Sequence, residues 1–401
     1  EDGMRVVQAN EAACRMLGFT GTELTRLQWA RTLVAQALVG AKFHLGVKGA
    51  DLVVYVEVAN EFRDPDTGGL RRDVIPWHHN SRSMPTFKLF SENSKMRCPT
   101  FDLPAGTAQL GGSCPGATWA QSNVPEPLLK LDGGRTVVNA PPFLLDEVEA
   151  DWQALAAHPK RRHDDLAPRL KAVNLKTAVC QHCYATGGKY GEVGVQFAEV
   201  AKFAFVQALV DRSPQLLEEL LFRTIRDSLK WDEETTRRHG VRPIRVHSSG
   251  DFYSTSYIDV WLKVAERLLA DPSTQDIRLW APTRTHVVKG YALHWAKSRV
   301  PANFIIRPSA YSVGDPAPYV SRPSPTGSKG TAVLFPDDAR PRIVRKGQAE
   351  FGDGSKFDYQ CGVYALQKGN KTCLSAVAPD GKVGCRACWT RPDLAISYVL
   401  H

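Results

Sequence analysis

Two groups of cysteines are the residues of this chain whose types and spacing best suit chemistry. Cys180 and Cys183 form a C-x-x-C pair, and the aromatic residue Tyr184 follows directly. Two thiolates at this spacing can reach one metal ion, because a tight turn lets both sulfur atoms point inward. A zinc half-site and a redox dithiol suit the same pair. Cys114, flanked by Pro and Gly, is the best third thiol, and Cys98 is a further candidate; the alternative for each is a small buried apolar residue.

The second group lies near the end of the chain and consists of Cys361, Cys373, Cys385 and Cys388. It spans 28 residues and closes with another C-x-x-C pair. Glycines recur between the cysteines, so we expect turns more than regular structure, and a bound metal would stabilise such a segment. Zinc and an iron–sulfur cluster both suit four thiolates. Two disulfides are the alternative, but clustered thiols in a reducing compartment more often bind metal.

Polar residues follow three predicted strands where each strand ends. His247, Ser249, Gly250 and Asp251 come after the first, Arg284 after the second and Ser309 after the third. In α/β folds, sites gather at the carboxyl ends of parallel strands. These residues are therefore predicted to line a ligand or substrate site.

Each of these residues has a purely structural alternative. Asp251 suits a base, a nucleophile or a ligand-binding carboxylate, but Asp251 or Ser254 can instead cap the following helix; we favour Ser254 as the cap. His247 alternates with Arg245, which predicts that both face the interior of the fold, yet a hydrogen-bonded core histidine fits equally well. Arg284 suits a carboxylate or phosphate, and otherwise a surface salt bridge. Gly250 allows a ligand to approach the backbone closely.

The elements that must position these residues alternate between strand and helix. A long amphipathic helix is predicted over 195–228, broken near Pro214. The segments that follow are strands at 244–252 (running into a loop), 276–281, 303–309 and 331–335, and helices at 257–269 and 287–297. Strands and helices at this spacing indicate parallel βα units. The predicted fold is α/β, a partial or complete parallel (β/α) barrel with a cysteine-rich metal-binding segment at its C-terminus.

Three regions follow from the same patterns: a helix-rich lead-in of unknown role at 1–84, the barrel-like core at 85–340 and the cysteine-rich segment at 341–401. Within the lead-in, helices are expected at 11–17 and 24–38, and a strand at 51–58.

Charge and hydropathy limit the kinds of partner that this chain can have. The net charge of +9 favours polyanions, and nucleic acid is the commonest of these. The chain has no apolar run long enough for a membrane helix, and its first residues do not resemble a signal peptide. The expected compartment is the cytoplasm, and the charge and cysteines leave the oligomeric state open.

Six short motifs together resemble the phage and prophage family called gene product 88, over roughly residues 85–395. They are Asn93–Met96, Thr100–Gly106, Ser113–Ala117, Cys180–Ala185, Val246–Ser254 and Cys385–Trp389. If the chain is phage-encoded, its compartment is the host cytoplasm.

That family is in turn similar to radical S-adenosylmethionine enzymes, in which a C-x-x-x-C-x-x-C loop holds a four-iron–four-sulfur cluster. The resemblance implies that Cys180, Cys183 and Tyr184 match the end of the loop. Position 176 is Lys176, so Cys114 would supply the third thiolate. It also implies S-adenosylmethionine as cofactor and hydrogen abstraction as chemistry, on nucleic acid or a nucleotide-derived substrate.

A second resemblance leads to a different class. The chain is loosely similar to guanine transglycosylases, which are zinc-bearing barrels that insert a 7-deazaguanine into RNA or DNA. The similarity lies in the stretch from Asp276 to Arg284, the late cysteines and His401. Asp251 or Asp276 would then be the nucleophile. A third hypothesis is a non-catalytic nucleic-acid-binding module whose metals serve only folding.

Overall fold

A computed structural model describes the parts of the chain on which the fold rests. The described residues are 42–48, 51–57, 86–93, 96–106, 112–115, 131–132, 135–136, 179, 183, 185, 190, 193–231, 233–287, 291, 294–295, 297–310, 319–320, 328–329, 331–334, 342–344, 348–350, 359–360, 387–392 and 396–399. The helices predicted at 11–17 and 24–38 lie outside them, as do Cys180, Tyr184, Cys361, Cys373 and Cys385.

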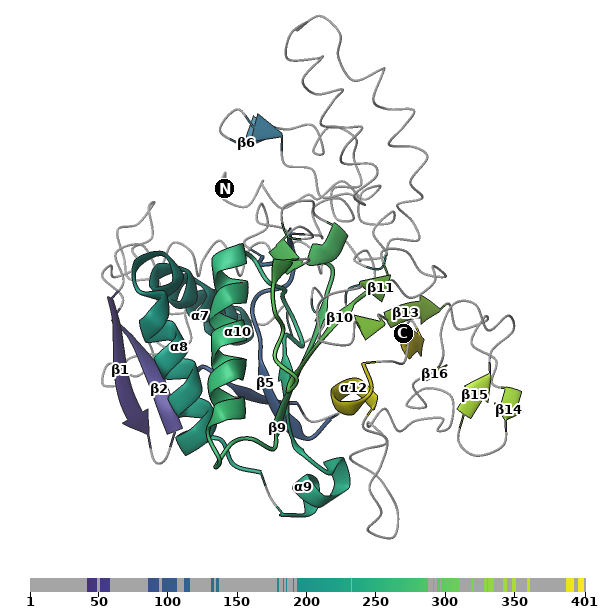
Figure 1. Cartoon of the computed structure of the whole chain (residues 1–401). Helices are drawn as coiled ribbons and strands as arrows, with labels where there is room; N and C mark the ends of the chain where they lie inside the picture. The colour runs from purple at the N-terminus through teal and green to yellow at the C-terminus, as the bar shows by residue number, and fades with distance from the viewer. Residues whose placement is uncertain are drawn as a thin grey trace, which may run out of the picture.

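A five-stranded sheet forms the centre of the molecule, in the order β10-β9-β8-β5-β4 (Figure 1). Its strands are β4 (Ser91–Asn93), β5 (Cys98–Phe101), β8 (Arg242–Val246), β9 (Ile277–Thr283) and β10 (Phe304–Pro308). Strands β5, β8, β9 and β10 run parallel, and β4 pairs antiparallel with β5. The predicted strands after residue 240 are confirmed, and the fold is mixed α/β with a largely parallel sheet.

Helices cover one face of this sheet, on the side where α7, α8 and α10 lie in Figure 1. The helical elements are α7 (Val193–Arg212), α8 (Pro214–Arg223), the π-helical turn η9 (Thr224–Ser228), α9 (Glu233–His239), α10 (Thr255–Ala270) and the 3-10 turn η10 (Thr285–Val287). The predicted break at Pro214 is confirmed, because Pro214 starts α8 and only Ser213 separates it from the end of α7. Helix α10 begins at the predicted cap: the Ser254 side chain accepts a hydrogen bond from the Tyr257 amide at 3.1 Å.

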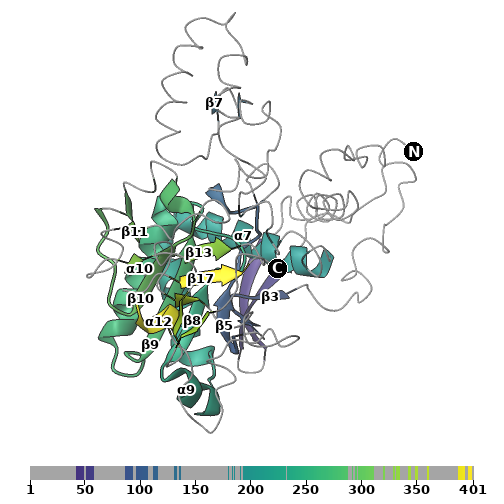
Figure 2. The same cartoon turned by 90° about the vertical axis from the view of Figure 1, so that its right-hand side faces the viewer.

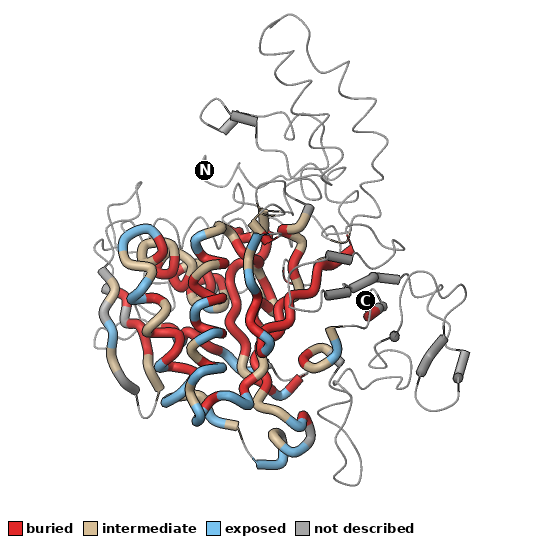
Figure 3. Tube along the Cα trace, in the orientation of Figure 1, coloured by how far each residue is buried: buried red, intermediate tan, exposed pale blue. Residues whose placement is uncertain are grey.

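The main core lies between the sheet and these helices, where the buried residues concentrate (Figure 3). Phe101 of β5 meets Trp261 of α10 edge-to-face, with ring centroids 5.3 Å apart. Phe252, just after β8, meets Trp295 in the same way at 5.3 Å. Large aromatic side chains thus fix the distance between the helical layer and the sheet.

A second, three-stranded sheet packs on the far side of the helices. It consists of β1 (Lys42–Lys48), β2 (Asp51–Glu57) and β3 (Thr86–Lys88), all antiparallel. The strand predicted at 51–58 is confirmed as β2. Phe43 of β1 lies 5.5 Å from Phe205 of α7, between ring centroids. The predicted lead-in therefore contributes a hairpin to the core, and β2 pairs with a strand beyond position 84.

The other face of the central sheet carries the C-terminal helix α12 (Ala387–Thr390), as Figures 1 and 2 show. Trp389 packs with Met96, Cys98, Trp280 and Ile305 in a small buried cluster. The buried guanidinium of Arg307 donates to the Arg391 carbonyl at 2.6 Å. Helix α12 therefore docks on the face of the central sheet opposite α10.

Short strands complete the described structure. They are β6 (Leu131–Asp132), β7 (Arg135–Thr136), β11 (Tyr319–Val320), β12 (Ser328–Lys329), β13 (Thr331–Leu334), β14 (Arg342–Val344), β15 (Gln348–Glu350), β16 (Tyr359–Gln360) and β17 (Ile396–Val399). The predicted strand at 331–335 is confirmed as β13, which runs parallel to β17. Among the described residues, no helix is long and apolar enough to span a membrane.

Candidate active site at the carboxyl edge

Buried polar side chains gather at one edge of the central sheet, where the parallel strands β5, β8, β9 and β10 end. Asp102 follows β5, Ser249 and Asp251 follow β8, Thr283 closes β9, and Ser309 follows β10. All five are at most 9% exposed. Burying polar groups is costly unless they are hydrogen-bonded, so the partners of each decide what this edge can do.

Asp102 joins the end of β5 to the loop after β8. Its Oδ1 accepts from the Thr100 hydroxyl at 2.8 Å and from the backbone amides of Ser248 at 2.7 Å and Ser249 at 3.3 Å. Its Oδ2 accepts from the Ser91 hydroxyl at 3.0 Å. Asp102 was not predicted as a site residue, because the two backbone amides that it holds lie about 150 residues further along the chain.

Asp251 repeats this arrangement one strand further along. Its Oδ1 accepts from the Phe252 amide at 2.8 Å and the Thr283 hydroxyl at 2.6 Å, and its Oδ2 accepts from the Arg284 amide at 2.9 Å. Burial raises the pKa of the Asp251 carboxyl to about 6, although these hydrogen bonds act to lower it. The carboxylate thus ties the loop after β8 to the end of β9.

Arg284 extends the series to the last parallel strand. Its Nε donates to the Ala310 carbonyl at 3.2 Å, just beyond β10. The Ser309 amide donates to the Thr283 carbonyl at 2.7 Å. Each parallel strand end is therefore linked to the next by a side chain from the loop between them.

His247 is a buried, neutral histidine. Its φ is +69°, in the left-handed region that non-glycine residues rarely adopt. Its Nε2 lies 3.1 Å from the Tyr257 hydroxyl, and the Phe252 ring packs edge-on at 4.7 Å between centroids. Burial, with Arg245 and Lys202 nearby, lowers its pKa to about 3.

The prediction that His247 and Arg245 face the same side is wrong. Strand β8 ends at Val246, so the alternation of side chains stops before His247, and its left-handed backbone turns the ring toward α10. Arg245 lies on the other face, with its guanidinium 4.8 Å from the centre of the Trp280 ring.

Helix α7 supplies two charged side chains that the sequence analysis missed. Glu199 and Lys202 lie one turn apart and are 6% and 4% exposed. The Ser249 hydroxyl lies 3.0 Å from Glu199 Oε1 and 2.8 Å from the Leu103 carbonyl. Burial lowers the pKa of the Lys202 amine, while Asp102 and Glu199 act to raise it. The signal in the sequence was a pair of charges inside the otherwise apolar stripe of α7.

Gly250 permits a close approach, and the chain itself occupies that space. Its φ is +80°, and a Cβ placed there would lie 2.5 Å from Ser113 Oγ and 2.7 Å from Leu103 Cβ. The residue must therefore be glycine for the loop after β8 to pack on residues 103 and 113.

The described cysteines fall in two places. Cys114 is half-buried near the carboxyl edge, where its amide donates to the Gly106 carbonyl at 2.9 Å. Cys98 starts β5 and is buried in the cluster against which Cys388 packs, on the face that α12 covers. Cys183 is also half-buried, and all four thiols are outside disulfides. No group of three potential metal ligands lies in the described part of the chain, and the metal sites that include Cys180, Cys361, Cys373 and Cys385 stay predictions.

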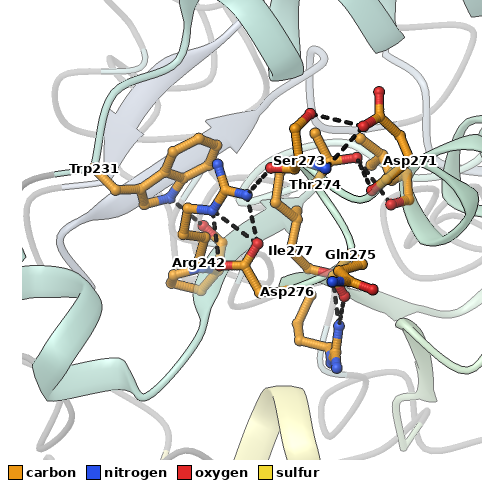
Figure 4. A network of polar contacts seen from close by, with 11 residues as sticks. Trp231, Arg242, Asp271, Ser273, Thr274, Gln275, Asp276 and Ile277 are labelled. Carbon is orange, nitrogen blue, oxygen red and sulfur yellow. Dashed lines mark hydrogen bonds and ion pairs between the residues drawn. The ribbon is translucent and has the colours of Figure 1, made fainter.

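Asp276 directly precedes β9, at the opposite edge of the sheet from Asp251. Figure 4 shows it facing the Arg242 guanidinium. It accepts from Arg242 Nε at 3.0 and 2.8 Å, and Arg242 also contacts the Ser273 carbonyl and stacks on Trp231. Hydrogen bonds from Arg242 lower the pKa of the Asp276 carboxyl. The partners of Asp276 are those of a structural ion pair joining β8 to the start of β9.

The fold and this edge define a class: a mixed α/β protein whose polar, buried residues converge where parallel strands end, as in enzymes built on such sheets. Within that class, the model of the family described as gene product 88 matches residues 77–391, so the chain belongs to that family. The family resemblance seen in the six motifs is thereby confirmed. No curated protein and no solved structure matches the chain.

Proposed function

We propose that this protein is an iron–sulfur enzyme of the radical S-adenosylmethionine type, with its active centre at the carboxyl edge of the parallel strands. The observation that carries the proposal is the position of Cys114. This half-buried residue follows Ser113, whose hydroxyl accepts from the Asp251 amide, at a buried polar edge linked strand by strand through Asp102, Asp251 and Arg284.

Three thiolates would hold the cluster: Cys114, Cys180 and Cys183, with Tyr184 next to the pair. A set of three thiolates suits a four-iron–four-sulfur cluster that keeps one iron open. When bound, such a cluster supplies the electron that reductively cleaves S-adenosylmethionine. Cys361, Cys373, Cys385 and Cys388 would hold a second, structural or auxiliary metal, for which zinc is the alternative.

The chain's own residues would shape the substrate side. Ser249 and Ser309 lie at strand ends where a cofactor or substrate would approach, whereas residues 103 and 113 fill the space beside Gly250. The Asp251 carboxylate is occupied by two amides and one hydroxyl, so its main work would be to hold the loop and the Arg284 backbone in place. His247, neutral at physiological pH, would act as a hydrogen-bonding group and not as a cation.

The order of the strands supports a partial (β/α) barrel. Going along the chain, β5, β8, β9 and β10 are added to the sheet in one direction, as they are in barrels.

A nucleic-acid or nucleotide-derived substrate is supported by the net charge of +9. Nine cysteines, with the four described ones reduced, suit a reducing cytoplasm.

Anaerobic purification tests the proposal. The protein should be brown, with iron and acid-labile sulfide in stoichiometric amounts. Cys114→Ala and Cys183→Ala should each lose most of the iron of the first cluster. Cys98→Ala is the matched control, because Cys98 is buried among apolar side chains and its loss should leave that iron in place.

Two other outcomes would replace the proposal. A colourless protein with stoichiometric zinc, active in base exchange and inactive as Asp251→Asn, would identify a guanine transglycosylase. In that case Asp251 is the better nucleophile candidate, because Asp276 is held by Arg242 at the far edge. A zinc-containing protein that binds nucleic acid, and still binds it as Asp251→Asn, would instead be a binding module.

A further inference from the structure

The segment that carries Cys114 is fastened to the chain that leaves β5. The Ser113 amide donates to the Pro104 carbonyl at 2.8 Å, and the Cys114 amide donates to the Gly106 carbonyl at 2.9 Å. A Cβ on Gly112 would lie 2.2 Å from the Gly106 carbonyl oxygen. The two backbones are therefore in direct contact, and no side chain fits between them.

The Ser113 hydroxyl reaches beyond this contact to the loop after β8. It donates to the Pro104 carbonyl at 2.9 Å and accepts from the Asp251 amide at 3.3 Å. Ser113 is 2% exposed, and its oxygen fills the space that Gly250 leaves open. One buried oxygen thus touches the segments after β5 and β8 and belongs to the residue next to Cys114.

From Asp251 the connection continues through its carboxylate. The carboxylate holds the Thr283 hydroxyl and the Arg284 amide, and Arg284 in turn holds the Ala310 carbonyl. A displacement at residue 113 would therefore disturb the hydrogen bonds at the ends of all four parallel strands, because buried polar groups must move together or lose their partners.

We propose that Ser113 is a positioning residue that couples the Cys114 thiol to the Asp251 loop. The inference rests on the proposed function, because that function explains why the two parts should be coupled. Cys114 would bind metal, and the Asp251 loop would shape the substrate side. Coupling of this kind is reciprocal, so whatever orders one side orders the other.

Thiol alkylation of the reduced, full-length protein after chelation of bound metal tests the coupling. In Ser113→Ala, iodoacetamide should modify Cys114 about tenfold faster, because the loss of its hydrogen bonds eases local opening. Cys388, on the other face of the sheet, should react at its original rate. Thr274→Val is the matched control: it removes a buried hydroxyl that donates to the Leu268 carbonyl at the opposite edge, and Cys114 should then react as in the wild type.

A double-mutant cycle separates positioning from general weakening. Asp251→Ala should also speed the alkylation of Cys114, and the double variant should react no faster than the faster single variant. The inference is overturned if the two effects simply multiply, if Cys388 accelerates along with Cys114, or if Cys114 does not accelerate at all.

Hydrogen exchange gives a measurement that needs no variant. In the metal-free wild-type protein, the amides of Cys114 and Asp251 should exchange through the same local opening of the structure. Their protection factors should therefore agree within about threefold. Protection factors that differ by more than about tenfold would overturn the inference. These measurements use metal-free protein, so a missing iron–sulfur cluster would end the proposed function and leave the coupling untouched.

Discussion

At the scale of single residues, the carboxylates of this site serve the protein's own backbone. Asp102 and Asp251 each accept hydrogen bonds from two backbone amides and from at least one side-chain hydroxyl. An aspartate used in this way is not recognisable from its neighbours in the sequence. Asp251 was predictable because it follows a clear strand. Asp102 was not, because β5 is only four residues long and lies in a Pro- and Gly-rich stretch.

The first prediction concerns Asp251, whose pKa is raised from 3.8 to about 6. The folded state holds this proton more tightly than the unfolded state, so the group's contribution favours folding below about pH 4 and is lost as the pH rises to 6. Asp251→Asn cannot titrate. Urea unfolding should show the wild type losing about 2.4 kcal/mol relative to this variant between pH 4 and pH 7. A constant difference between the two proteins across that range would contradict the prediction.

His247 gives the opposite pH dependence. Its pKa is lowered from 6.5 to about 3, so the unfolded state binds the proton more readily and stability falls as the pH drops below 6.5. His247→Asn removes this titration, and Asn tolerates the left-handed backbone at this position. Relative to the variant, the wild type should lose about 2 kcal/mol on going from pH 7 to pH 5. Urea unfolding at the two pH values checks this, and an equal loss in both proteins would exclude His247 as the cause.

At the scale of elements, the part of the chain from α7 to β10 was predictable because local pattern and tertiary role agree. Apolar residues at helical spacing mark α10, and short β-branched and aromatic runs mark β9 and β10. The pairing of the strands was harder to predict from the sequence. The placement of β5 beside β8, and of β4 on its other edge, depends on contacts between distant parts of the chain.

The start of α10 provides a test at this scale. Ser254→Ala removes the oxygen that accepts from the Tyr257 amide, which should lower the free energy of unfolding by about 1 kcal/mol. Ser256→Ala is the matched control, since Ser256 is exposed in the first turn of the same helix. Thermal unfolding of both variants measures the effect, and equal stabilities would show that the cap contributes nothing.

At the scale of the whole molecule, the helical layer lies between two sheets. Val53, Val54 and Val56 of β2 are at most 2% exposed, and Phe43 packs against both Phe87 and Phe205. The sequence revealed the strand but not this role, because a short apolar strand does not show which surface it will cover. The hairpin of β1 and β2, which precedes position 84, thus belongs to the folded core.

Two shortened chains test that role. A chain starting at residue 85 lacks β1 and β2 and exposes the apolar face of α7 and β3, whereas a chain starting at residue 42 keeps the hairpin. The shorter chain should unfold at a clearly lower temperature or aggregate, because it uncovers several buried valine and phenylalanine side chains. Melting curves of the two chains, recorded side by side, measure the contribution of the hairpin; superimposable curves would show that it is dispensable.

The parallel pairing of β5 with β8 has a consequence for how the chain folds. Thr100 pairs with Arg245, whereas β8, β9 and β10 follow one another closely, so the β8–β10 unit can form from local contacts while β5 must return across a long connection. Until β5 arrives, one edge of β8 is unpaired, and an unpaired strand edge invites association with other chains. We therefore expect β8–β10 to gain amide protection first during refolding and β5 last, and we expect aggregation to compete at that final step.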